Sequence, residues 1–167
     1  ASGRRSTRTS PKAAIRRARG MSSPTRPALA LRCHGGLTSR QCVEQASAAE
    51  HAGLSTVWFA ENPFGRGAWP AAAACAVATR RVRIGVGVLN PHQHHPTLMA
   101  MEIAAFDELS EGRAVLGIGA GIPSRIKKTH APVGRPIAAV RDAVTITRGL
   151  LRGATVTYAG KAFSADG

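Results

Sequence analysis

The sequence predicts an α/β domain built on parallel β-strands. Residues 81–121 hold a β-branched run (82–88), a polar loop (90–95), a helix, a glycine turn and a second short strand. Such a strand–helix–strand crossover joins strands that run in the same direction in one sheet. Polar residues follow directly after the expected strands, where α/β folds place their binding and catalytic groups. The chain of 167 residues is 44% hydrophobic, which is enough for one domain with a buried core.

The first strand–helix unit opens this domain. Residues 28–33 form an apolar run typical of a buried strand, although alanine is a weak strand former. A helix is expected to follow, because Thr38 and Gln41 have the spacing of a capping box. Gly53 is expected to end this helix in the left-handed conformation.

The second unit places an acidic residue at the end of a strand. Residues 55–60 are rich in strand formers and are followed by Glu61 and Asn62. After a loop of proline and glycine, an alanine-rich helix is expected over residues 68–79. Glu61 is therefore expected at the carboxyl edge of the sheet.

The third helix is expected to begin at Pro96, a residue well suited to the first helical position. On an ideal helical wheel, Leu98, Phe106 and Leu109 span an arc of about 80° and predict the buried face. Glu102 falls inside this arc. A buried carboxylate needs a compensating partner, so Glu102 either has one in the core or bends out to water.

The last part of the chain supplies a fourth unit and a small hairpin. A strand is expected over residues 114–119, followed by a loop over residues 120–133. Pro136 is expected to open a helix that Gly153 ends, and residues 155–163 are expected to form the hairpin. The apolar residues assigned to the buried face of that helix are Ile137, Val140, Val144 and Leu151.

The net charge of +14 is concentrated near the N-terminus, where residues 1–20 carry seven Lys and Arg and no acid. This composition predicts a disordered tail over residues 1–24 and a folded domain over residues 25–167. A basic tail can bind nucleic acid through the phosphates, but residues 1–26 contain no aromatic residue for base stacking. Alternatively, Met21 is the true start and the residues before it are translated upstream sequence.

The cysteines and the apolar pattern predict a cytoplasmic protein. Cys33, Cys42 and Cys75 are odd in number, widely spaced and form no C-x-x-C, which is typical of reduced thiols. No apolar run is long enough to cross a membrane. No apolar segment follows Arg4 and Arg5, so the N-terminus does not resemble a secretory signal.

Two short motifs each allow two interpretations. His92, His94 and His95 are of a type that binds metals, but neighbouring loop residues rarely converge and no Cys or acid has ligand spacing, so no metal site is expected. The sequence GIGAG at 117–121 is neither a dinucleotide fingerprint nor a P-loop. It predicts either a close approach of the backbone to a ligand or a tight turn.

Several blocks together carry a specific resemblance. They are residues 53–61, 80–96, 106–121 and 135–153. In sequence and arrangement these blocks resemble the luciferase-like flavin-dependent oxidoreductases, most of all the methylenetetrahydromethanopterin-reductase-like branch that uses coenzyme F420. The resemblance extends over about residues 28–167.

The resemblance implies a (β/α)₈ barrel, which needs about 250 residues. This chain resembles the N-terminal half only, with four parallel strands in the order 1-2-3-4, and is expected to be a truncated chain that is inactive alone. The relatives are commonly dimers, so a homodimer is possible for the full-length protein. The alternative is a complete small open domain with the strand order 2-1-3-4.

The resemblance also implies which residues hold the cofactor ring. A bulge with a non-proline cis peptide at Gly87–Val88 would support the ring, and Asn90 would line its polar edge. The turn from Gly119 to Gly121 would approach the ring and the ribityl side of the cofactor.

Glu61 matches the acidic position after the second strand and is the expected catalytic residue. Asn62 stands where the relatives often have His, and His94 stands where they often have Arg. The implied function is hydride transfer between reduced coenzyme F420 and a small organic substrate. The alternatives are an FMN-dependent monooxygenase of the same fold and, in another class, nucleic-acid binding through the basic tail.

Overall fold

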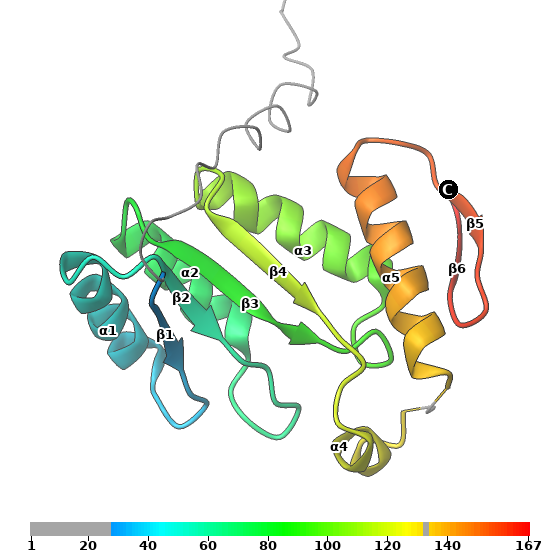
Figure 1. Cartoon of the computed structure of the whole chain (residues 1–167), viewed down its shortest axis with the longest axis horizontal. Coiled ribbons are helices and arrows are strands. Elements are labelled where there is room, and N and C mark those ends of the chain that lie inside the picture. Colours follow the sequence, from blue (N-terminus) through cyan, green and yellow to red (C-terminus); the bar gives the residue numbers. More distant parts are fainter. Residues whose placement is uncertain (1–27, 132–133) are drawn as a thin grey trace, which may run out of the picture.

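The structure, a computed structural model, describes residues 28–131 and 134–167, so the expected tail over residues 1–24 lies outside the described residues. Four parallel strands form one sheet in the order β1-β2-β3-β4 (Figure 1). This order confirms the prediction and excludes the open domain in which the first strand lies inside the sheet. The strands are β1 (Ala30–Cys33), β2 (Thr56–Phe59), β3 (Arg83–Leu89) and β4 (Ala114–Ile118).

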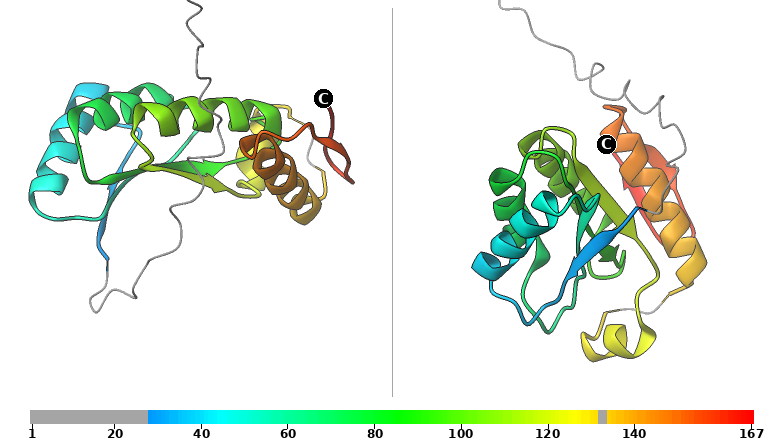
Figure 2. Two further views of the ribbon diagram at one scale, coloured as in Figure 1. Left: turned by 90° about the horizontal axis from the view of Figure 1, so that it is seen from above. Right: turned by 60° about the vertical axis from the view of Figure 1, so that its left-hand side comes forward.

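The helices cover one face of this sheet. Figure 2 shows α1 (Ser39–His51), α2 (Ala68–Ala78) and α3 (Pro96–Leu109) in one layer above the strands, with no helix beneath them among the described residues. Helix α5 (Pro136–Leu151) lies beyond the β4 edge and packs against α3. The hairpin of β5 (Thr157–Ala159) and β6 (Ser164–Asp166) lies against α5.

The segment between β4 and α5 contains a short helix that the sequence did not predict. Residues 120–133 were expected to form a loop, but α4 spans Pro123–Lys128. Pro123 provides the fixed backbone angle that suits a helix start. Six residues are too few to show a helical period, which explains why the pattern gave no signal.

The first helix begins and ends as its sequence predicts. Thr38 Oγ1 accepts a hydrogen bond from the Gln41 N–H at 3.2 Å, and Gln41 Oε1 accepts one from the Thr38 N–H at 2.9 Å. Gly53 follows with a φ of 78°, the conformation expected of it.

The core lies between the sheet and the helix layer. Val57 and Phe59 of β2 and Ile84 of β3 are buried there against the small side chains of α2. Burial also raises the pKa of the Cys33 and Cys75 thiols to about 12, with nearby Cys42 adding to the effect. All three cysteines are free, and thiols with such pKa values stay protonated and unreactive.

The buried face of α3 differs from the predicted one. Phe106 is buried as expected, but Leu98 and Leu109 are 50% and 48% exposed. Met99 and Ile103 face the core instead. Glu102 is consequently exposed, which supports the interpretation that its side chain reaches water.

The buried face of α5 was also predicted wrongly. Ile137 is 77% exposed, whereas Ala139, Ala143 and Ile146 are fully buried. The helix packs against α3, and Thr147 Oγ1 donates a hydrogen bond to the Pro96 carbonyl at 3.1 Å. The buried side of α5 thus carries mostly small residues, with Ile146 as its one large apolar side chain, and this composition allows close packing.

Asp142 on α5 holds the hairpin in place. This buried carboxylate accepts hydrogen bonds from the Tyr158 hydroxyl at 2.8 Å and from the Ala162 and Phe163 N–H groups at 2.7 and 3.2 Å. Burial alone would raise the pKa of Asp142, but these hydrogen bonds outweigh it and lower the pKa. The absence of a side chain at Gly160 is required here, because a Cβ would overlap the carboxylate.

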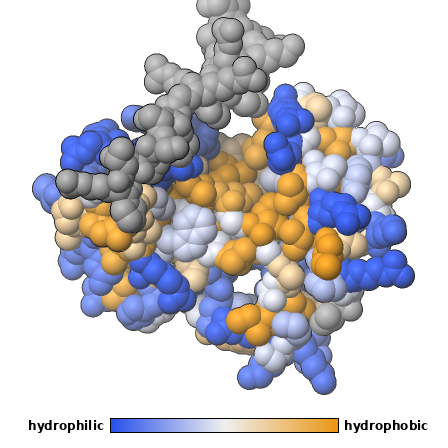
Figure 3. Space-filling view, viewed as in Figure 1, coloured by the Kyte–Doolittle hydropathy of each residue, from blue (hydrophilic) through white to orange (hydrophobic). Residues whose placement is uncertain are grey.

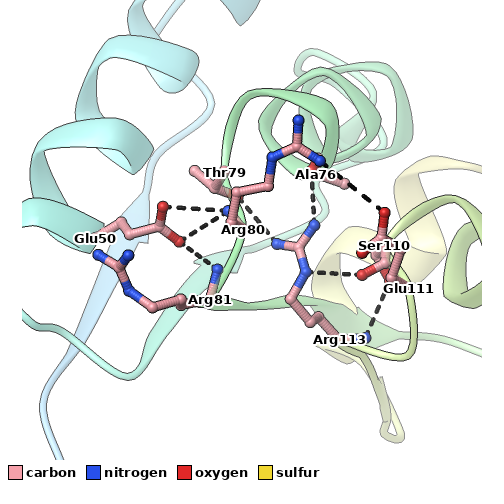
Figure 4. Close-up of polar contacts among 8 residues, drawn as sticks. All are labelled: Glu50, Ala76, Thr79, Arg80, Arg81, Ser110, Glu111 and Arg113. Carbon is pink, nitrogen blue, oxygen red and sulfur yellow. Dashed lines mark hydrogen bonds and ion pairs between the residues drawn. The ribbon is translucent and has the colours of Figure 1, made fainter.

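Arg113 joins the segments at the amino ends of β3 and β4 (Figure 4). Its guanidinium donates to the carbonyls of Ser110 and Ala76, both at 2.7 Å, to the Val82 carbonyl at 3.1 Å and to Thr79 Oγ1 at 3.0 Å. One side chain thus ties the end of α2 to the turn before β4.

Glu50 at the end of α1 completes this end of the sheet (Figure 4). Its carboxylate accepts hydrogen bonds from the N–H groups of Arg80, Arg81 and Val82, with the shortest at 2.6 Å from Arg81. Burial acts to raise the pKa of Glu50, but the three N–H groups and the charge of Arg81 lower it to about 2.

No helix in the described part of the chain combines the length and apolar character that crossing a membrane requires.

Candidate functional site

A cleft of about 450 Å³ opens at the carboxyl ends of β2, β3 and β4. The six residues that the sequence assigned to the site all line it: Glu61, Gly87, Val88, Asn90, Gly119 and Gly121. Parallel strands end at the same edge of a sheet, so residues from three separate loops converge here. The roles of these residues remain predictions, while their common location is now a structural fact.

Strand β3 is irregular where it enters the cleft. The peptide bond between Gly87 and Val88 is cis, as the resemblance implied, and the pairing with β4 shifts register between Val86 and Leu89. A Cβ on Gly87 would lie 2.7 Å from the Gly117 carbonyl oxygen, so only glycine allows this approach of β3 to β4. Val88 is 55% exposed and presents an apolar surface to the cleft.

Asn90 carries a buried hydrogen-bond donor without a partner. Asn90 is only 4% exposed, and its Oδ1 accepts a hydrogen bond from the His92 N–H at 3.0 Å. Nδ2 makes no hydrogen bond to any of the residues that the structure describes. An unsatisfied buried donor costs about 1–3 kcal/mol, which an acceptor on a bound ligand would recover.

The glycines of the β4 turn leave room for these two side chains. A Cβ on Gly119 would come within 2.5 Å of Val88 Cγ1, and a Cβ on Gly121 within 2.5 Å of Asn90 Nδ2. Gly121 also has a φ of 74°, which favours glycine. The glycines of the GIGAG motif therefore form a turn that packs closely against Val88 and Asn90, and an approach of this backbone to a ligand stays a prediction.

Trp58 lines the cleft, although no sequence pattern assigned it to the site. Its indole lies across the sheet over two glycines: a Cβ on Gly117 would be 3.1 Å from Cζ2, and one on Gly85 would overlap the ring. A weak signal was nevertheless available, because glycines on two neighbouring strands next to a tryptophan strand indicate space for a flat side chain.

His94 does not line the cleft but contacts Glu61, which does. Its Nε2 lies 2.7 Å from Glu61 Oε2, and the side chains of His94 and Glu61 are 31% and 16% exposed. The hydrogen bond to Glu61 raises the pKa of His94 against the opposing effect of burial, and the charges of Glu61 and Glu102 raise it further. The pair joins the end of β2 to the loop after β3.

The three histidines do not converge on a metal. His92 and His95 pack against Phe163, with ring centroids 5.5 and 5.7 Å apart, while His94 turns to Glu61. Within residues 28–131 and 134–167, no group of three or more His, Cys, Asp or Glu side chains has a geometry that could hold a metal ion.

Comparisons with known proteins agree with this architecture. The model of the family described as luciferase-like monooxygenase matches residues 18–167. The chain is 35% identical over 119 residues to the 5,10-methylenetetrahydromethanopterin reductase of Archaeoglobus fulgidus, covering 71% of this chain and 36% of that protein. It is 40% identical over 91 residues to the F420-dependent glucose-6-phosphate dehydrogenase of Amycolatopsis mediterranei, covering 49% of this chain and 27% of that protein.

Solved structures show the same fold. The coenzyme F420 dependent tetrahydromethanopterin reductase of Methanopyrus kandleri superposes with a TM-score of 0.77 at 24% identity, covering 83% of this chain and 44% of that chain. The oxygenating constituent of 3,6-diketocamphane monooxygenase from Pseudomonas putida, solved with FMN, gives 0.71 at 22% identity, covering 83% and 43%. The sheet therefore corresponds to the N-terminal half of a (β/α)₈ barrel.

The chain spans about a third of the length of the curated relatives, with 36% of the Archaeoglobus fulgidus protein covered. The family model nevertheless matches nearly the whole chain, from residue 18 to residue 167. The chain belongs to the luciferase-like monooxygenase family.

Proposed function

We propose that this chain supplies half of a binding site for coenzyme F420 and supports hydride transfer between the reduced cofactor and a small organic substrate. The observation that carries the proposal is the cleft in which exposed Val88 stands beside the unpartnered Nδ2 of Asn90. An apolar surface next to a neutral donor suits a flat ring with a carbonyl edge. Relatives named as F420-dependent enzymes support the choice of cofactor.

The residues present fit such a ring. Val88 would bear on one ring face, Asn90 Nδ2 would donate to a ring carbonyl, and the backbone from Gly119 to Gly121 would allow close approach. When bound, the deazaflavin supplies the hydride chemistry itself. The protein then has three tasks: to orient the ring, to exclude water and to provide a charged or proton-holding group. Glu61 is the candidate for the last task, because its carboxylate lines the same cleft.

An FMN-dependent monooxygenase is the second candidate. The neighbour from Pseudomonas putida was solved as an FMN complex, and its fold matches over 83% of this chain. Asn90 and Val88 would serve the flavin ring in the same way. The proposed partner in both cases is a small-molecule substrate, with a homodimer possible for the full-length protein. Nucleic-acid binding through the basic tail remains an alternative that concerns residues outside the described ones.

The test is a titration of the protein expressed from the complete gene with F420 and, separately, with FMN. We expect F420 to bind with micromolar or tighter affinity. Binding can be measured by the quenching of tryptophan fluorescence, because Trp58 lines the cleft. Tight FMN binding without F420 binding would transfer the proposal to the monooxygenase. Binding of neither would contradict it.

Asn90→Ala provides the residue-level test of the same site. We expect cofactor binding to weaken by about 1–3 kcal/mol, because the buried amide then no longer donates to the ring. Asn62→Ala is the matched control: Asn62 follows the neighbouring strand β2, does not line the cleft, and its Oδ1 accepts a hydrogen bond only from the local Phe64 N–H, at 3.3 Å. Equal affinity for both variants and the wild type would remove Asn90 from the site.

A further inference from the structure

Glu61 and His94 form a connection between the cleft and solvent. Glu61 lines the cleft at the end of β2, and its side chain is only 16% exposed. His94 comes from the loop after β3, does not line the cleft and has a side chain 31% exposed. The 2.7 Å contact between His94 Nε2 and Glu61 Oε2 joins the two. A proton-carrying group in contact with water thus touches a carboxylate in contact with the cleft.

The charges around His94 favour its protonated form. Glu61 faces it from the end of β2, and Glu102 faces it from α3. Both carboxylates raise the pKa of His94, the hydrogen bond to Glu61 being the largest cause, while burial opposes them. Within the part of the chain that the structure describes, no cation forms a competing ion pair with Glu61. His94 therefore holds a proton at hydrogen-bond distance from the Glu61 carboxylate.

We propose that Glu61 and His94 are a proton relay that supplies the cleft, and that the substrate is one that takes up a proton on reduction, such as a carbonyl or imine compound. This inference rests on the proposed function, in which reduced F420 provides the hydride. As the hydride bonds to the carbon, the electron pair of the C=O or C=N bond moves to oxygen or nitrogen and takes a proton from Glu61. His94 returns a proton to Glu61 and receives one from water.

The relay gives the two residues different roles. Glu61 touches the cleft and would be a catalytic residue, whereas His94 acts through Glu61 and is a positioning residue. The competing explanation is a purely structural ion pair between two loops. His94→Arg separates the two explanations, because arginine keeps the ion pair but does not release its proton. His94→Gln keeps a hydrogen bond and carries no transferable proton.

The experiment uses the protein expressed from the complete gene, loaded with F420 or, if only that binds, with FMN. The cofactor on the protein is first reduced and then mixed in a stopped-flow instrument with small carbonyl and imine compounds as probes, and its oxidation is followed at the cofactor absorbance in H2O and in D2O. In the wild type, oxidation by a reactive probe should be slower in D2O, because a proton from the relay reaches the probe together with the hydride. In His94→Gln and His94→Arg, oxidation should be roughly 100-fold slower than in the wild type, the lower end of the contribution of a positioned acid–base group. Cofactor affinity should stay within about twofold of the wild type, because neither substitution alters a group assigned to the ring.

Two further variants make the result decisive. Glu61→Gln should slow oxidation of the cofactor by the probe as His94→Gln does, and it should lower the pKa of His94 measured by NMR, because the largest cause of the raised pKa is removed. His51→Gln is the control, since His51 lies at the end of α1, where its Nδ1 contacts the Ser47 carbonyl at 2.7 Å. Oxidation of the cofactor by the probe at the wild-type rate in His94→Arg would overturn the relay, and a wild type that binds the cofactor but reduces none of the carbonyl and imine probes would overturn the substrate class. Failure of both cofactors to bind would instead overturn the proposed function.

Discussion

Gly121 sets the position of the Asn90 amide at the scale of single residues. Its φ of 74° is one constraint, and the 2.5 Å that would separate a Cβ at this position from Asn90 Nδ2 is another. Gly153, with a φ of 71°, has the first constraint without the second, because nothing lies within 4 Å of a Cβ there. Comparing alanine substitutions at the two glycines therefore separates the energetic cost of the backbone conformation from the effect on the Asn90 amide.

We expect Gly153→Ala to lower the free energy of unfolding by about 1 kcal/mol, since alanine is disfavoured at positive φ, and Gly121→Ala to lower it further, because its Cβ would also overlap the Asn90 amide. Only Gly121→Ala should also reduce cofactor affinity, by about tenfold or more, because it displaces the Asn90 amide. Chemical denaturation and F420 titration measure the two effects. Equal affinity for both variants would show that the amide does not contact the cofactor.

Val88 and Val77 provide a second pair of matched positions. Val88 is 55% exposed in the cleft and Val77 is 63% exposed on α2, on the far side of the sheet. Val88→Trp should abolish cofactor binding by filling the space for the ring, whereas Val77→Trp should leave it unchanged. Both variants should unfold within about 1 kcal/mol of the wild type, because both side chains project into solvent. Ring binding that survives Val88→Trp would place the cofactor elsewhere.

The residues of the site were predictable because their strands end at the same edge. Glu61, Asn90 and Gly119 follow three different strands, and parallel pairing alone brings them together. The contact between His94 and Glu61 was not predictable, since it depends on the path of a loop. Trp58 was missed because its position becomes informative only when the glycines on neighbouring strands are known to face it.

The elements were predicted better in their order than in their faces. Capping residues fixed the start of α1, since Thr38 and Gln41 interact locally. The face of α5 was wrong because bulky Ile137 indicated burial, whereas packing against α3 and the hydrogen bonds of Asp142 determine which side faces inward. Such a choice depends on contacts between segments distant in sequence, which helical periodicity does not contain.

Glu50 links the end of α1 to the segment before β3, and the stability that this link provides should depend on pH. Its pKa is about 2 in the folded chain against an ordinary value of 4.5. A lowered pKa stabilises the fold above the unfolded value and loses that effect as the pH falls through the folded value. Glu50→Gln should therefore reduce the free energy of unfolding above about pH 5, with the difference shrinking between about pH 4.5 and 2.

Denaturation series at several pH values measure this effect. Glu44→Gln is the control, because Glu44 is an exposed carboxylate on the same helix. A difference between wild type and Glu50→Gln that stays constant down to pH 2 would mean that the three N–H groups do not stabilise the carboxylate.

At the scale of the whole molecule, helices cover one face of the sheet and, among the described residues, leave the other face uncovered. Figure 3, in the same view as Figure 1, shows hydrophobic side chains gathered over the middle of the uncovered face. Strands β1 and β4 each have one edge without a partner strand among the described residues. Apolar faces and free strand edges favour association, and a closed barrel removes both. The family resemblance predicted this half-barrel, whereas the strand pattern alone left the open domain possible.

The chain of 167 residues should therefore bind the dye 1-anilinonaphthalene-8-sulfonate with a clear increase in fluorescence. The protein expressed from the complete gene should bind much less dye if further strands cover the same face. Equal and low fluorescence for both would show that the face is protected in the short chain as well. Gel filtration at several concentrations serves as the control for self-association.

The hydrogen bonds that Arg113 makes with Ala76, Thr79, Val82 and Ser110 have a consequence for laboratory evolution of this chain. These hydrogen bonds lie at the amino ends of the strands and involve no residue of the cleft. Randomisation confined to Gln93, Ile122 and Arg125, which line the cleft from the segments that follow β3 and β4, leaves those bonds intact. A library of that design should retain a high proportion of folded members while sampling many shapes of the cleft. Ligand binding at the carboxyl end of the sheet can therefore be selected without loss of the stabilising contacts at the amino end.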